Sequence, residues 1–249
     1  MRNEDGLIID RQKCTMCGLC WQECPANAIE VLGEQISVEE LINEVIKDET
    51  YYQKSDGGVT FSGGEPTLQS GFVIESLKQL KQLNIQTALD TCGFFAFDTL
   101  EKILPYTNLV LYDLKLIDSY LHTKYTGQSN EIILKNLDNL ISKKAVNPDT
   151  FEIWIRTPLI PGITATKANL TSIATHLLSA GIEQINRWEL CAFNNLCQDK
   201  YKRIDMEWEF VHTPLMTKIE LDECREWCLQ TGFPSDKVIV TGAAKVVCS

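Results

Sequence analysis

Short apolar segments alternate with amphipathic helical segments along the chain from Gly57 onward, and this alternation restricts the possible folds most. The strand-like segments are 58–62, 85–91, 108–115, 151–160, 185–193 and 237–242. Apolar residues at helical spacing mark the segments between them, at 70–83, 97–104, 130–143, 166–181 and 222–232. Such alternation predicts an α/β fold with a parallel sheet and crossover helices. Periodicity alone leaves open whether the sheet is doubly wound or part of a barrel.

The beginning of the chain follows a different pattern. Strand-like segments at 6–10 and 27–33 flank a run of cysteines, and Ser37 with Glu40 forms a capping box that predicts a helix start. A chain of 249 residues suits one large domain with a small appendage, since domains average about 150 residues. We therefore expect an appendage at residues 1–36 and a main domain at 37–249.

The appendage carries the motif C-x2-C-x2-C-x3-C-P, formed by Cys14, Cys17, Cys20, Cys24 and Pro25. This spacing is typical of bacterial ferredoxins, in which three cysteines serve one 4Fe–4S cluster and the fourth ligates a second cluster. Thiolates select iron–sulfur clusters or zinc, but a zinc site would need two separated pairs. The motif predicts iron–sulfur ligation by these four cysteines. No second run supplies the remaining ligand.

Composition and the termini argue against several classes of partner. The chain has 34 acidic and 23 basic residues, a net charge of −11, which disfavours binding to nucleic acid or to an anionic membrane. No apolar run approaches the ~20 residues of a membrane span, and MRNEDGLIID lacks the apolar core of a secretion signal. Ten cysteines without an export signal indicate thiolate chemistry, so we expect a cytoplasmic protein.

Polar residues gather where the predicted strands end, at the edge of a parallel sheet that binds ligands in α/β folds. The candidates are Gly63, Gly64, Glu65, Asp90, Thr91, Asp113, Lys115, Arg156 and Asn194. Simpler readings exist: the glycines suit an ordinary turn, and Asp113 with Lys115 suits a surface ion pair. His122 and His176 are expected to pack rather than to bind a metal. Cys224 and Cys228, four residues apart, fit the core face of a helix.

Five ordered segments carry a resemblance to a known family. GGVTFSGGEPTLQ (57–69) resembles the glycine-rich signature of the radical S-adenosylmethionine enzymes that activate glycyl-radical enzymes. Segments 88–93, 112–137, 155–164 and 194–201 also resemble that family. The resemblance implies a partial (β/α) barrel of the radical SAM type with a ferredoxin-like insert, a 4Fe–4S cluster and S-adenosylmethionine. It further implies anaerobic, reductive cleavage of that cofactor to a 5′-deoxyadenosyl radical. That radical would abstract a hydrogen atom from a backbone glycine of a partner glycyl-radical enzyme and so leave a glycyl radical there, with flavodoxin or ferredoxin as electron donor for the cleavage.

The resemblance also assigns roles to the residues at the strand ends. It implies that Gly63, Gly64 and Glu65 bind the methionine amino group, and that Lys115 meets the methionine carboxylate. Asp90, Thr91 and Asp113 would hold a monovalent cation, and Arg156 would lie near the cofactor. Asn194 stands where the family usually has a histidine that contacts the nucleoside. No side chain is assigned as catalytic.

One departure from the family is substantial. The C-x3-C-x2-C motif of radical SAM enzymes is absent, because Cys20 and Cys24 have the first spacing but Asn27 occupies the third position. We therefore expect this sequence to be the carboxyl-terminal part of a longer activase, without the first barrel strand and the catalytic loop. The alternative is a non-catalytic remnant that transfers electrons or binds a partner. Radical chemistry on a peptide or ribosomal substrate is disfavoured by YDLK (112–115) and TGQSN (126–130).

Overall fold

The computed structural model describes residues 2–3, 6–7, 9–31, 33–204 and 206–245. The chain forms two compact units, 1–41 and 42–249. The division falls inside helix α2 (Val38–Val45), a few residues beyond the boundary after residue 36 that the sequence indicates.

The first unit contains little regular structure. Strands β1 (Arg2–Asn3) and β2 (Gly6–Leu7) form an antiparallel pair, and α1 (Leu19–Gln22) is a single helical turn within the cysteine run. The strand expected at 6–10 appears only as β2, and Ile8 lies outside the described residues. The strand expected at 27–33 is wrong for the described part of that segment. Asn27 has a φ of 46° and Gly33 a φ of 99°, which break an extended conformation at both ends.

The capping box at Ser37 is confirmed. The Glu40 N–H donates to Ser37 Oγ at 3.2 Å, and the Ser37 N–H donates to Glu40 Oε2 at 2.8 Å. Helix α2 begins there and continues through the 3-10 turn η1 (Ile46–Asp48) into α3 (Glu49–Ser55), which the sequence did not indicate. Asp56, with a φ of 51°, ends α3 and directs the chain into the sheet.

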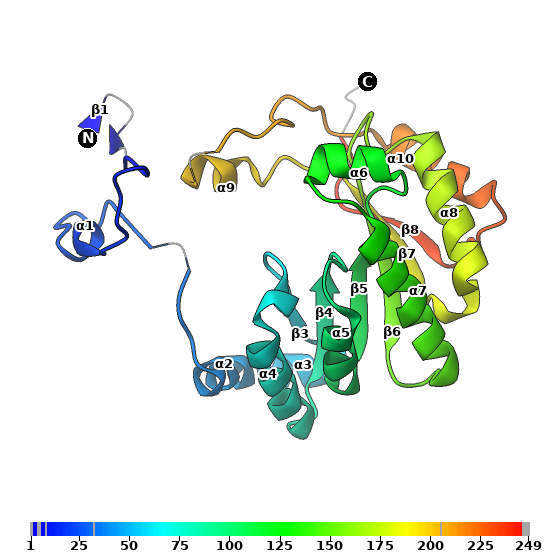
Figure 1. Ribbon diagram of the computed structural model, residues 1–249, viewed down its shortest axis with the longest axis horizontal. Helices are drawn as coiled ribbons and strands as arrows, with labels where there is room; N and C mark the ends of the chain where they lie inside the picture. The colour runs from blue at the N-terminus through cyan, green and yellow to red at the C-terminus, as the bar shows by residue number, and fades with distance from the viewer. Residues whose placement is uncertain (1, 4–5, 8, 32, 205, 246–249) are drawn as a thin grey trace. The chain divides into compact units, whose positions relative to one another are not determined.

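Six parallel strands form the sheet of the second unit, and they follow one another in chain order. They are β3 (Gly58–Phe61), β4 (Gln86–Thr91), β5 (Leu109–Asp113), β6 (Glu152–Leu159), β7 (Arg187–Ala192) and β8 (Val238–Thr241). In a doubly wound sheet the strand order reverses at one point, so helices lie on both faces. Here the order does not reverse. Because all crossovers have the same hand, every connecting helix then lies on the same face of the sheet. The partial barrel of the radical SAM type is therefore confirmed (Figure 1).

Helices cover the outer face of this curved sheet. The long ones are α4 (Ser70–Gln82), α7 (Glu131–Val146), α8 (Lys167–Gly181) and α10 (Lys218–Leu229). Shorter pieces are α5 (Phe97–Ile103), α6 (Ser119–Thr126), α9 (Gln198–Arg203), η2 (Pro66–Gln69), η3 (Leu104–Tyr106) and η4 (Ile182–Gln184). No helix within the described part of the chain has the length and apolar character to cross a membrane.

The hydrophobic core lies between the outer face of the sheet and these helices. Leu89 of β4, Ile153 of β6 and Leu137 of α7 are fully buried there. Cys224 and Cys228 of α10 belong to the same core, as their spacing predicts. Burial raises the pKa of these thiols to about 11 and about 12. These cysteines therefore serve packing.

The opposite face of the sheet, here called the inner face, carries polar and charged residues. Along β6 the residues alternate between buried and half-buried, because successive side chains point to opposite faces. Trp154 and Arg156 are half-buried on the inner face, while Ile153 and Ile155 are fully buried. Trp188 of β7 is also fully buried, and its Nε1 donates to Thr157 Oγ1 at 3.0 Å.

Candidate functional site

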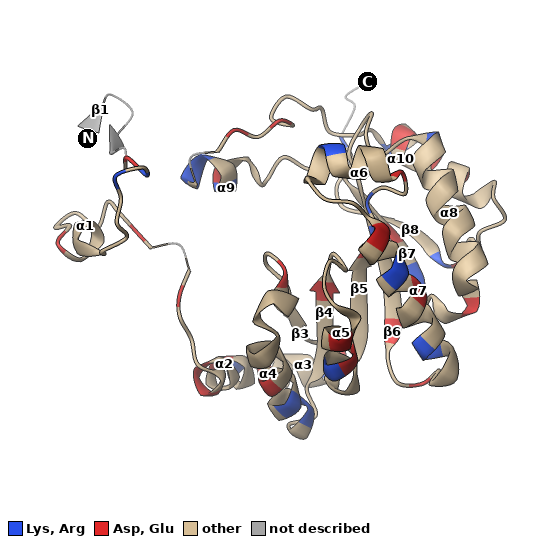
Figure 2. Cartoon of the chain, in the orientation of Figure 1, with Lys and Arg blue, Asp and Glu red and all other residues tan. Residues whose placement is uncertain are grey.

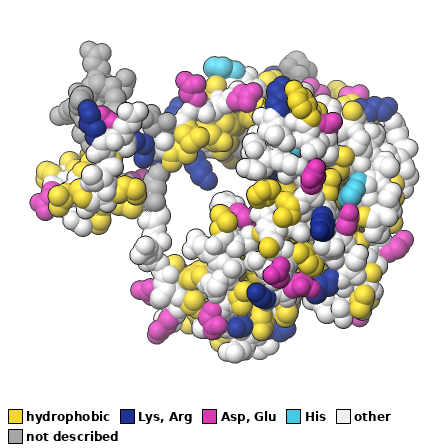
Figure 3. Space-filling view, in the orientation of Figure 1, with side chains coloured by type: hydrophobic (Ala, Val, Ile, Leu, Met, Phe, Trp, Pro, Cys, Tyr) yellow, Lys and Arg dark blue, Asp and Glu magenta, His cyan; other side chains and the backbone are white. Residues whose placement is uncertain are grey.

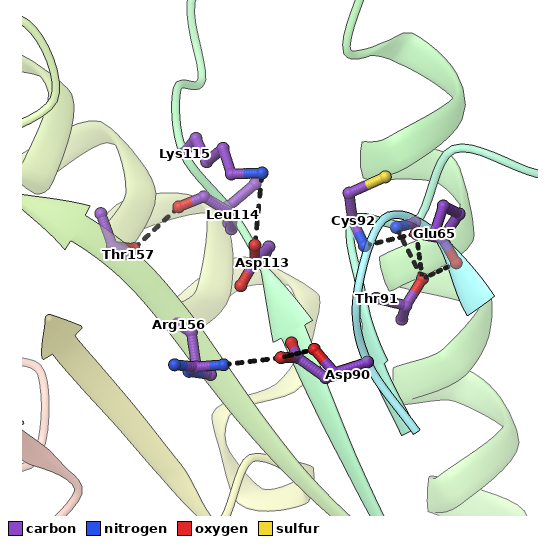
Figure 4. A network of polar contacts seen from close by, with 11 residues as sticks. Glu65, Asp90, Thr91, Cys92, Asp113, Leu114, Lys115, Arg156 and Thr157 are labelled. Atoms are coloured by element: carbon purple, nitrogen blue, oxygen red, sulfur yellow. Dashed lines mark hydrogen bonds and ion pairs between the residues drawn. The ribbon is translucent and has the colours of Figure 1, made fainter. Parts of the chain in front are cut away.

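Four charged side chains meet on the inner face at the carboxyl ends of β4, β5 and β6 (Figure 4). Arg156 Nη1 lies 3.1 Å from Asp90 Oδ2, which also accepts a hydrogen bond from Ser62 Oγ at 2.8 Å. Lys115 Nζ lies 3.2 Å from Asp113 Oδ2. The structure therefore brings together four of the residues that the sequence singles out, from three neighbouring strands.

In this group of four side chains, burial and the neighbouring charges act on the pKa values in opposite directions. Burial raises the pKa of Asp113, with a further contribution from Asp90, while Lys115 acts in the opposite direction. Burial alone would lower the pKa of Arg156, but Cys191, Asp90 and Asp113 nearby raise it above its usual value. Two carboxylates and two cations, all half-buried, thus face a common space. Such a set is complementary to a ligand that carries both charges, such as an amino acid.

Glu65 holds the glycine-rich loop against β4. Its Oε1 accepts from Thr67 N at 3.2 Å and from Thr67 Oγ1 at 2.7 Å, and its Oε2 accepts from Cys92 N at 2.9 Å. The Thr91 hydroxyl lies within hydrogen-bond distance of both oxygens. Burial alone would raise the pKa of Glu65, but the hydrogen bonds from Thr67 and Cys92 hold it below its usual value. The carboxylate is therefore engaged within the protein by Thr67, Thr91 and Cys92, and its contact with the methionine amino group stays a prediction.

Thr91 points away from the two carboxylates with which the resemblance groups it. It follows Asp90 in β4, so its side chain lies on the other face of the strand, buried against Glu65. The structure thus places Asp90 and Asp113 together and does not add the Thr91 hydroxyl to them. Gly63 and Gly64, by contrast, are exposed, and a side chain at either position would meet no atom. The loop can therefore present bare backbone to a ligand.

At Gly93 the backbone conformation and a close neighbour exclude a side chain. Its φ is 77°, and an added Cβ would lie 1.9 Å from the Tyr112 hydroxyl oxygen. Tyr112 is fully buried, and its hydroxyl donates to the Ile133 carbonyl at 2.7 Å. The glycine of ALDTCG is thus a packing requirement next to the site.

Asn194 lies at the carboxyl end of β7, as predicted, and is exposed. Its Oδ1 accepts from the Leu196 N–H at 3.1 Å, and no contact joins it to the four charged side chains. The following segment is organised by Trp208, whose ring stacks on Phe193 at 6.0 Å and on Tyr201 at 5.9 Å between centroids. Helix α9 in this segment carries basic residues (Figure 2), and exposed hydrophobic side chains surround it (Figure 3).

Among the buried amides that fix the loops of the site, Asn136 and Asn169 were missed by the sequence analysis. Asn136 of α7 donates to the carbonyls of Gly93 and Phe95 at 2.9 and 2.8 Å. Asn169 of α8 donates to the Lys115 carbonyl at 2.9 Å and accepts from the Ile117 N–H at 3.1 Å. Each asparagine occupies a position in the apolar stripe of its helix. A polar residue in an apolar stripe is the sequence signal that could have indicated a buried hydrogen-bonding role for each of them.

Backbone hydrogen bonds favour the thiolate form at two of the four cysteines in the run. The pKa of Cys17 is lowered chiefly by a hydrogen bond from the backbone N–H of Leu19. The pKa of Cys24 is lowered chiefly by a hydrogen bond from the backbone N–H of Ala28. The Ala28 N–H lies 3.2 Å from Cys24 Sγ. This donor chemistry fits an iron–sulfur cluster. Within the described residues, however, no three His, Cys, Asp or Glu side chains are gathered around a point that could hold a metal ion. Ligation by Cys14, Cys17, Cys20 and Cys24 therefore stays a prediction.

His122 and His176, the two histidines considered in the sequence analysis, both contact other parts of the protein. His122 is 5% exposed, and its Nδ1 lies 2.7 Å from the Gln128 carbonyl oxygen. His176 Nε2 lies 3.1 Å from Asp138 Oδ1 on the neighbouring helix α7.

Comparison with known proteins agrees with the fold and the motifs. Residues 11–169 match the Radical SAM superfamily. The chain is 37% identical to the (2S)-3-sulfopropanediol dehydratase activating enzyme of Klebsiella oxytoca, over 81% of this chain and 62% of the relative. It is 34% identical to the trans-4-hydroxy-L-proline dehydratase activating enzyme of Clostridioides difficile, over 88% of this chain and 80% of the relative.

A solved structure supports the same relationship. A domain of the pyruvate-formate lyase-activating enzyme from Bacteroides vulgatus aligns with a TM-score of 0.59 and 29% identity, over 75% of this chain and 99% of that domain. The fold and these matches define a radical SAM protein. Within that superfamily, the chain belongs to the family of activating enzymes for glycyl-radical enzymes. That family uses S-adenosylmethionine and a 4Fe–4S cluster. The chain spans less than two thirds of the length of the Klebsiella relative.

Proposed function

We propose that the inner-face site binds the methionine part of S-adenosylmethionine. The observation that carries this proposal is the pairing of Asp90 with Arg156 and of Asp113 with Lys115, at 3.1 and 3.2 Å, where parallel strands end. Methionine carries an ammonium and a carboxylate, so it can exchange these internal ion pairs for its own.

Each side chain has a task in this proposal. Lys115 and Arg156 attract the methionine carboxylate, and the exposed backbone of Gly63 and Gly64 accepts from the amino group. Asp90 and Asp113 hold a monovalent cation beside the carboxylate. Glu65 and Thr91 act indirectly, because they fix the glycine loop against β4. When bound, the cofactor and a reduced cluster together supply reductive cleavage to methionine and a 5′-deoxyadenosyl radical.

We further propose that the protein substrate is a glycyl-radical enzyme, in line with the names of the relatives, and that flavodoxin or ferredoxin supplies the electron. The 249 residues contain no C-x3-C-x2-C motif. We propose that the cluster that meets the cofactor takes its cysteines from a further segment or a second polypeptide. The chain described here supplies the methionine site and the barrel wall.

Replacement of Lys115 tests the binding proposal. Lys115→Ala leaves Asp113 without its partner and removes the charge that attracts the cofactor carboxylate. Losing one member of such a half-buried pair costs about 2–5 kcal/mol. Each 1.4 kcal/mol corresponds to a tenfold change in affinity, so we expect the affinity to fall about 30-fold or more. Calorimetric titration with S-adenosylmethionine measures it.

Lys124→Ala is the matched control, since Lys124 is an exposed lysine on α6. We expect its affinity to equal that of the unaltered chain. Equal affinities for Lys115→Ala and Lys124→Ala would show that the inner-face group is not the cofactor site.

A further inference from the structure

Strand pairing places three charged residues in one row across the inner face. Asp113 of β5 pairs with Arg156 of β6, and Arg156 pairs with Glu189 of β7. The guanidinium of Arg156 therefore has a carboxylate on each side. Asp113 belongs to the candidate cofactor site, whereas Glu189 lies on the far side of the arginine.

Glu189 is a carboxylate held between two guanidinium groups. Its Oε2 lies 3.6 Å from Arg156 Nε, its Oε1 lies 3.5 Å from Arg187 Nη1, and only 13% of its side chain is exposed. Arg156 Nε is itself buried and has no hydrogen-bond partner. A buried donor without a partner is costly, and the nearby Glu189 oxygen can accept from it after a small approach.

Arg187 is fixed in turn by an aromatic ring. Its guanidinium carbon lies 3.8 Å from the centroid of the Trp154 ring, a close cation–π contact. Trp154 is anchored by a 2.8 Å hydrogen bond from its Nε1 to Glu152 Oε2. Trp154 and Arg187 therefore support the side of Glu189 that faces away from Arg156.

We propose that Glu189 is a positioning residue that orients Arg156. By attracting Nε, it turns the guanidinium so that Nη1 faces Asp90 and the cofactor site. Without Glu189, the arginine is attracted only toward Asp90 and Asp113, where it competes with the cation and with the methionine amino group. The effect on cofactor binding rests on the proposed function, whereas the orientation of Arg156 does not.

The first test needs no ligand. The Nε–H proton of Arg156 is observed by nitrogen-15 NMR and assigned with the variant Arg156→Lys. We expect its solvent exchange to accelerate at least about tenfold in Glu189→Gln, because the charged acceptor is lost. Glu189→Asp retains the charge and should restore part of the protection. Glu226→Gln, an exposed change on α10, should leave the exchange unchanged. Unchanged exchange in Glu189→Gln would overturn the inference.

The second test is the affinity for S-adenosylmethionine at neutral pH. Without Glu189, Arg156 is attracted only toward Asp90 and Asp113, so we expect the affinity of Glu189→Gln to fall about tenfold. Glu189→Asp keeps the negative charge and should recover part of the affinity, whereas Glu226→Gln should bind as the unaltered chain does. A role in packing alone would make the shorter Glu189→Asp the weaker binder of the two.

The two tests separate the inference from the proposed function. If the unaltered chain binds no S-adenosylmethionine but Glu189→Gln exposes Arg156 Nε, the proposed function fails and the positioning of Arg156 stands. If the cofactor binds to the unaltered chain and to Glu189→Gln with the same affinity, Glu189 has no positioning role in binding.

Discussion

Glu65→Gln is the sharpest probe of how the glycine loop is held. Glutamine keeps the length and planarity of glutamate, and its oxygen can continue to accept from Thr67. Its amide nitrogen, however, takes the place of Oε2, which accepts from the Cys92 N–H at 2.9 Å. Two donors then face each other. The Cys92 N–H loses its partner, whereas the Thr91 hydroxyl can rotate and donate to the remaining oxygen.

One backbone donor left unsatisfied in a partly buried place costs about 1–3 kcal/mol. In a domain of this size each kcal/mol lowers the melting temperature by about 2–4 °C. We therefore expect a decrease of about 2–12 °C, measured by circular dichroism, with a matching decrease in the free energy of unfolding from urea titration. Glu75→Gln on the exposed face of α4 is the control and should change the stability by less than about 0.5 kcal/mol.

The pH dependence of the stability supplies an independent check, because the depressed pKa of Glu65 fixes the direction of the change. The folded pKa of Glu65 is depressed, so its contribution to stability is fully present above the unfolded pKa of about 4.3. That contribution is lost as the pH falls through the folded pKa. The stability difference between the unaltered chain and Glu65→Gln should therefore shrink below about pH 4. A Glu65→Gln variant with unaltered stability at pH 7 would refute the assignment of Glu65 as the brace of the loop.

Two further predictions concern the cysteines. Under native anaerobic conditions iodoacetamide should modify Cys17 and Cys24 first, because their pKa is lowered, and Cys224 and Cys228 last, because burial raises theirs to about 11 and about 12. Peptide mass spectrometry gives the order, and early modification of Cys228 would contradict it. After reconstitution with iron and sulfide, the 249-residue chain should hold at most one cluster and form no 5′-deoxyadenosine with dithionite, because it has no C-x3-C-x2-C motif. Iron analysis and chromatography test this, and cofactor-dependent turnover by the chain alone would overturn it.

The sequence was most informative where periodicity determines structure. Every strand of the six-stranded sheet lies within a segment whose apolar pattern predicts it. Strand order was not readable, because pairing partners are set by crossovers and leave no trace in local periodicity. Helix α3, α6 and α9 were missed, since each has no more than eight residues and buries little.

Within the candidate site, the position of polar residues at the ends of predicted strands located Asp90, Asp113 and Arg156. The alternation of side chains along a strand explains why all three lie on the inner face. The same rule puts Thr91 on the other face, so the sequence already held the reason why Thr91 does not join them. The engagement of Glu65 was beyond local reasoning. Its partners Thr91 and Cys92 lie 26 and 27 residues away in the chain and meet it only after β3 and β4 pair.

Asn136 and Asn169 link the site to the dynamics of the whole domain. Loops that carry ligand-binding residues usually open at little cost in free energy, independently of the core. Here the Gly93 and Phe95 carbonyls are held by Asn136, and Lys115 and Ile117 are held by Asn169. Both asparagines belong to helices that are seated on the hydrophobic core. These loops can therefore open only if their contacts to α7 and α8 break, so the geometry of the site is as long-lived as the packing of the helix layer behind it.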